Sequence, residues 1–154
     1  MKKNNKGFSL VELIVVVLIM AIIATALTLA VTKYVAKSKR SSDANTAGEL
    51  KTAAETTVTD YLTSVNNLGA GTIKITGAKD TEWDAESSVD GYQDADFESI
   101  FKTAAGKTAP TAKVYPQESF NIFITIDDAT NATYDVRYTN DTSSAIDIFK
   151  EATK

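Results

Sequence analysis

The chain has 154 residues, enough for one domain with a sizeable core, and a formal net charge of −4 that disfavours general nucleic-acid binding. It contains neither cysteine nor histidine, which excludes disulfides, thiolate metal sites and a lipid-modified cysteine. Histidine is the commonest general base, and the sequence has no nucleophile–base arrangement or phosphate loop, so we expect no enzymatic activity, cofactor or metal.

An apolar segment follows a short basic leader. Residues 13–31, LIVVVLIMAIIATALTLAV, are interrupted only by Thr25 and Thr28, and about 20 such residues cross a bilayer as a helix. Nearly every residue from Phe8 to Val31 is apolar, yet Glu12 lies inside this wider stretch, although a carboxylate at the centre of a membrane helix costs roughly 2.5–3.5 kcal/mol. Basic residues flank both ends of the run, so charge does not decide its orientation.

An ordinary secretory signal peptide is an alternative interpretation of this start. It would use residues 2–6 as the basic region, the apolar run as its core and Ala24-Thr25-Ala26 as the cleavage site. The mature product would then be a secreted binding domain beginning at Leu27. Glu12 has no explanation on this interpretation, and the cut would divide a helix.

That helix is predicted to run from about residue 8 to about residue 65. No proline occurs before Pro110, Gly48 is the only glycine between Phe8 and Gly69, and Asn66 with Asn67 favours an end there. An apolar stripe at helical spacing comprises Ala47, Leu50, Ala54, Val58, Tyr61, Leu62 and Val65. We expect Glu49, Lys51, Glu55, Thr57 and Asp60 to face water.

Period-two patterns after the helix predict strands over 72–76, 120–126, 133–139 and 145–149. Short turn-forming connections favour an antiparallel meander of the last three. Its apolar face would cover the helical stripe, which predicts an α+β fold with one shared core. The intervening connection, 77–118, is expected to be surface exposed and to contain a short helix over 94–105.

Several weaker signals lie in or near these elements. The acidic segment 80–98 does not fit an EF-hand, because Ala85 and Gly91 stand where glycine and glutamate are needed, so a solvated loop is favoured over a Ca²⁺ site. Trp83 and Tyr92 either form an exposed aromatic contact or cover the core. Asn131 and Asn140 match glycosylation acceptors in form, for which chance is the better explanation.

The start KGFSLVELIVVVLIMAII resembles the N-terminal signature of the type IV prepilins, a family of pilins and of the pseudopilins of type II secretion and competence systems. The matching residues are Gly7, Phe8, Ser9, Leu10, Val11, Glu12 and Leu13. The motif covers about the first thirty residues, and a long helix followed by an antiparallel sheet agrees with the family fold.

The resemblance implies that a membrane prepilin peptidase cuts between Gly7 and Phe8 and N-methylates Phe8. It divides the chain into a cytoplasmic leader (1–7), a transmembrane and assembly helix (8–32) and a head (33–154) with a variable connection over 66–118 and a meander over 119–150. Glu12 of one subunit would meet the Phe8 amine of a neighbour and fix axial register. The alternative is that Glu12 is a plain residue of the membrane boundary.

The predicted function is therefore that of a structural type IV pilus subunit serving surface adhesion or motility. Its partners would be further copies of itself, prepilin peptidase and the pilus assembly machinery, without nucleic acid. It would span the cytoplasmic membrane once before assembly and lie at the cell surface afterwards. A pseudopilin is the alternative within the family.

The chain departs from many family members at two places. Ala21 and Leu29 stand where a glycine and a proline often break the apolar helix, and no cysteines are available to close the head. We therefore predict a continuous helix from Ala21 to Thr32 in the isolated subunit, because every backbone donor in this stretch can stay paired.

Overall fold

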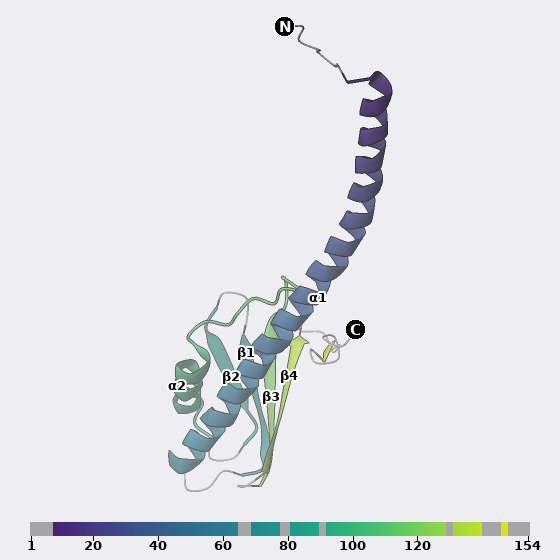
Figure 1. Ribbon diagram of the computed structural model, residues 1–154. Coiled ribbons are helices and arrows are strands. Elements are labelled where there is room, and N and C mark those ends of the chain that lie inside the picture. The colour runs from purple at the N-terminus through teal and green to yellow at the C-terminus, as the bar shows by residue number, and fades with distance from the viewer. Residues whose placement is uncertain are drawn as a thin grey trace. The chain divides into compact units, whose positions relative to one another are not determined.

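Helix α1 runs from Leu10 to Ser64 and is the longest element of the computed structural model (Figure 1). The structure describes residues 8–64, 69–77, 81–89, 92–128, 131–139 and 146–147. Its contacts divide the chain into two compact units, Met1–Lys37 and Ser38–Lys154. Helix α1 contributes residues to both units.

In the first unit, all described side chains from Phe8 to Lys37 are exposed. The exposed fraction of the large apolar side chains runs from 45% at Val35 to 85% at Phe8. By length and composition, α1 is the one helix among the described residues that could cross a membrane. A soluble monomer would leave this whole apolar surface in water, which is unfavourable.

The helix of this unit is unbroken between Ala21 and Thr32, as predicted. Thr25, Thr28 and Thr32 donate hydroxyl hydrogen bonds to carbonyls three or four residues earlier, at 2.8–3.2 Å. Their polar groups are thereby satisfied within the helix itself, which makes threonine compatible with an apolar surrounding.

The second unit contains an antiparallel sheet with the strand order β2-β1-β3-β4-β5. Its strands are β1 (Gly71–Gly77), β2 (Trp83–Ser87), β3 (Ser119–Asp128), β4 (Asn131–Thr139) and β5 (Ile146–Asp147). Strands β3 and β4 confirm the first two strands of the meander, and β5 confirms part of the third. Val65, Ala145, Ile148 and Phe149 lie outside the described residues.

The core forms between α1 and one face of this sheet, which the second part of α1 crosses in Figure 1. Register brings Ile75 opposite Ile122 and Ile122 opposite Val136, so alternate strand residues share the buried face. From the helix come Ala47, Leu50, Ala53, Ala54, Val58 and Tyr61. The α+β fold is therefore confirmed.

Thr57 corrects one prediction about the helix. It was expected to face water, yet its side chain is fully buried. Its hydroxyl donates to the Ala53 carbonyl at 2.7 Å, so the helix satisfies the polar atom and the methyl group can pack in the core.

The connection between β1 and β3 corrects a second prediction, because part of it belongs to the core. Strand β2 pairs with the edge of β1, and its residues alternate between buried Trp83 and Ala85 and exposed Asp84 and Glu86. The acidic residues had obscured this period-two pattern. The Trp83 indole N–H donates to the Gly106 carbonyl at 3.0 Å, so the tryptophan covers the core rather than forming an exposed contact.

Helix α2 (Asp94–Ala105) has the bounds predicted from sequence and packs beside β2. Its buried residues Phe97 and Phe101 meet Tyr61 and Trp83 edge-on, with ring centroids 5.4 and 5.2 Å apart. The Tyr61 hydroxyl also accepts the Gln93 N–H at 2.7 Å. Aromatic packing and this bond attach α2 to the end of α1.

Two glycines give opposite expectations for stability. A Cβ at Gly48, within α1, would meet nothing within 4 Å, whereas one at Gly77 would lie 2.5 Å from the Trp83 ring and closer still to Ala109. Gly48→Ala should therefore stabilise the second unit by about 1 kcal/mol through helix propensity. Gly77→Ala should destabilise it by about 1–3 kcal/mol through overpacking.

Urea unfolding of the detergent-solubilised chain, followed by fluorescence of Trp83, measures both changes, because Trp83 is the single tryptophan. Equal midpoints for the two variants would contradict the packing described at Gly77.

Candidate functional site

The first turn of α1 carries the residues that the sequence singled out. Ser9 precedes the helix, and its backbone N–H donates to Oε2 of Glu12 at 3.0 Å. The Leu13 N–H donates to the Ser9 carbonyl at 3.2 Å and closes the first turn. This arrangement is the glutamate half of a capping box, in which a residue at the third helical position reaches back to the residue before the helix.

Phe8 and Glu12 thus lie at the same end of one helix, and both are exposed. Gly7, the predicted cleavage residue, lies outside the described residues. Glu12 is the only acidic residue between Phe8 and Asp43, and the positions that follow it are apolar. In hydrocarbon, an ionised carboxylate needs a cation or several hydrogen bonds, and the Ser9 N–H is only one donor.

A second carboxylate, Asp43, was not singled out by the sequence patterns. Its side chain is 1% exposed. The Lys113 N–H donates to Oδ1 at 2.9 Å and Oδ2 at 3.0 Å, and the Val114 N–H donates to Oδ2 at 2.9 Å. The Tyr138 hydroxyl also donates to Oδ2, at 2.7 Å. Such charge-assisted bonds make the burial of a carboxylate tolerable.

Asp43 therefore connects three segments of the second unit: α1, the stretch before β3 and strand β4. A weak signal was available, since Asp43 lies four residues before Ala47 and so continues the buried stripe by one turn. The partners of the carboxylate are 70 and 95 residues away in sequence, so no local pattern indicated them.

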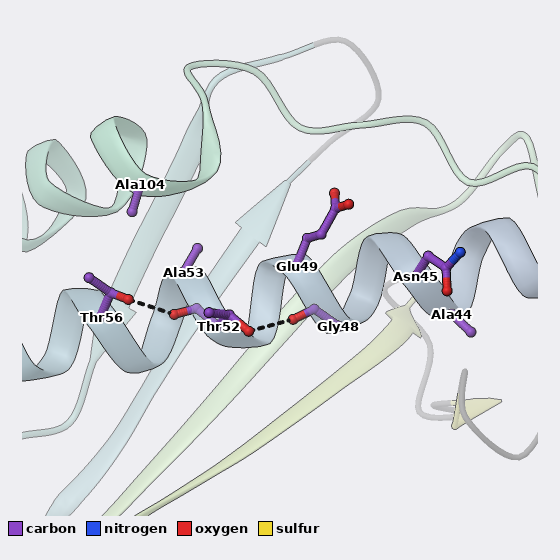
Figure 2. A pocket seen from close by; sticks show the side chains of 8 residues that line it. All are labelled: Ala44, Asn45, Gly48, Glu49, Thr52, Ala53, Thr56 and Ala104. Carbon is purple, nitrogen blue, oxygen red and sulfur yellow. Dashed lines mark hydrogen bonds between the residues drawn. The ribbon is translucent and has the colours of Figure 1, made fainter.

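An open groove of about 880 Å³ follows the side of α1 (Figure 2). Its lining is Ala44, Asn45, Gly48, Glu49, Thr52, Ala53, Thr56 and, from α2, Ala104. The hydroxyls of Thr52 and Thr56 donate to the carbonyls of Gly48 and Thr52, at 3.1 and 2.9 Å. The groove consequently offers mostly small side chains and methyl groups, a surface suited to close packing rather than to chemistry.

Where the structure describes the acidic segment 80–98, two of its glutamates form ion pairs with lysines. Glu82 accepts from Lys102 at 2.9 Å and lies 3.2 Å from Lys107, and Lys102 also bonds Glu98. The hydrogen bond from Lys102 and then that from Lys107 lower the pKa of Glu82. No cluster of potential metal ligands occurs among the described residues; Asp80 and Asp90 lie outside them.

One of the two glycosylation-like positions lies within the described residues. Asn131 is exposed at the start of β4, and Asn140 lies outside the described residues. The exposure of Asn131 does not change the interpretation drawn from sequence.

We predict that the Asp43 carboxylate is a principal stabilising group of the second unit. Asp43→Ala should lower the free energy of unfolding by about 3 kcal/mol, because two N–H groups and a hydroxyl lose their acceptor. Tyr138→Phe, which removes one donor and keeps the ring, should cost about 1 kcal/mol. The measurement is urea unfolding of the detergent-solubilised variants. If Asp43→Ala were no worse than Tyr138→Phe, the backbone N–H bonds would carry little of the stability.

The comparison with known proteins bears on the start of the chain. Residues 2–28 match the family model described as the prokaryotic N-terminal methylation motif, which is the class III signal of type IV pilins. No curated protein and no solved structure matches the chain. The match lies within the first unit and includes Gly7, Phe8 and Glu12.

Proposed function

We propose that this type IV pilin-like chain is the structural subunit of a filament, assembled through α1. The observation that carries the proposal is the methylation motif at the start of a helix whose apolar side chains are all exposed as far as Lys37. A membrane covers that surface before assembly, and the packed helices of other subunits cover it afterwards. One helix can thus serve two apolar environments.

In this proposal, prepilin peptidase removes residues 1–7 and methylates the new amine of Phe8. Residues 8–32 then anchor the subunit in the cytoplasmic membrane, and residues 33–154 form the head. The Glu12 carboxylate of one subunit pairs with the Phe8 amine of a neighbour. Each charge is costly alone in an apolar surrounding, and pairing them fixes the axial register of the subunits.

The finer role that we propose is a pilus at the cell surface serving adhesion or motility. A pseudopilin of a secretion or competence system is the second candidate, because the same methylation motif begins both kinds of protein. Electron microscopy of the native host distinguishes them: long surface filaments labelled by an antibody to this chain indicate a pilin.

The first test of the proposal is the mature terminus. We expect the protein purified from membranes or filaments to begin at Phe8 and to carry one N-methyl group. Mass spectrometry of the N-terminal peptide measures both features. A terminus at Leu27 would instead establish the signal-peptide interpretation.

The second test removes the charge. Glu12→Val should insert more readily into the membrane, by up to about 3 kcal/mol on insertion scales, and should abolish or cripple filament formation. Cleavage after Gly7 should continue in this variant, whereas a bulky residue in place of Gly7 should block it. Sheared filaments and processed subunit are quantified from the same cells. Wild-type filament numbers from the Glu12→Val strain would contradict the pairing.

A further inference from the structure

The bond between Ser9 and Glu12 has a consequence beyond capping, and it rests on the proposed function. Once residues 1–7 are removed, the nitrogen of Phe8 becomes an amine and the Ser9 N–H becomes the first backbone amide of the chain. That amide is one of the donors that a helix start leaves unsatisfied. Glu12 is the group that accepts it, through Oε2 at 3.0 Å.

The same bond orders the carboxylate. Glu12 has several rotatable bonds, and holding a free side chain in one geometry during assembly would cost conformational entropy. With Oε2 held by the Ser9 amide, the side chain is already folded back to the helix start. Among the described residues, Oε1 accepts no hydrogen bond and remains open to a further donor.

We propose that the backbone amide of Ser9 is a positioning group for assembly: it holds Oε2 of Glu12 so that Oε1 is presented to the methylated amine of the adjoining subunit. One carboxylate then receives two donors, one from its own helix and one from the neighbour. Glutamate at position 12 makes this bond, whereas aspartate, whose side chain is one methylene shorter, should reach the preceding amide less well.

The charge and the cap can be separated at Glu12 itself. Glu12→Gln keeps the side-chain length and an oxygen that can accept the Ser9 N–H, but it removes the charge. Glu12→Asp keeps the charge, but its side chain is too short to reach the Ser9 N–H well. We expect Glu12→Gln to leave hydrogen exchange of the Ser9 amide within about threefold of wild type while filaments are lost. Glu12→Asp should speed that exchange and lower filament yield by roughly tenfold.

The donor can be deleted with a matched control. Ser9→Pro removes the backbone N–H and leaves Glu12 intact, and Ser9→Ala loses the same hydroxyl but keeps the N–H. Filament yield per processed subunit should fall by roughly tenfold in Ser9→Pro and stay within about twofold of wild type in Ser9→Ala. If Ser9→Pro is not cleaved, the Glu12→Asp result decides.

The measurements use the full chain, expressed in cells that process it. Sheared filaments and processed subunit are quantified by immunoblot, and Ser9 exchange is followed by nuclear magnetic resonance in detergent micelles. Wild-type filament yield from Glu12→Asp, or unprotected exchange of Ser9 in the wild-type subunit, would overturn the positioning role. Failure of the processed wild-type chain to form filaments would overturn the proposed function instead.

Discussion

The buried carboxylate of Asp43 is the interaction on which the arrangement of the second unit depends. Apolar contacts are not directional. The helical stripe that meets the sheet contains several alanines, and such small side chains do little to define the position of α1 along its own axis. Four hydrogen bonds to Asp43 are directional, and they come from the backbone at Lys113 and Val114 and from Tyr138. They fix where α1 lies against β4 in a chain that has no cysteine.

Glu12 presents the opposite case on the same helix. Asp43 has its donors within its own unit, so it can be buried in the subunit. Among the described residues, Glu12 has one donor, the Ser9 amide, and it lies on a surface of exposed apolar side chains. A carboxylate that is half satisfied in the subunit has capacity left for a partner. The contrast between the two acids separates a group that completes the fold from one that we propose completes an assembly.

The apolar surfaces of the two units show the same contrast: one is covered within the subunit and the other is exposed. In the second unit, the stripe of α1 is covered by the sheet, and aromatic residues of α2 and β2 complete the core. In the first unit, the apolar side chains have no cover from the described residues. Removing these side chains from water therefore favours insertion of the helix into a membrane or its packing against other subunits.

The sequence alone determined the elements whose signals are local. Apolar composition and spacing identified α1, the alternation of Phe120, Ile122, Ile124 and Ile126 identified β3, and the motif around Glu12 identified the methylation signal. Only the tertiary structure decided the contacts between distant segments. It buried Trp83 in a strand that acidic neighbours had made resemble a loop, and it placed Thr57 in the core. It also gave Asp43 its donors, because a polar group can be buried wherever distant residues pair with it, and no local pattern records those partners.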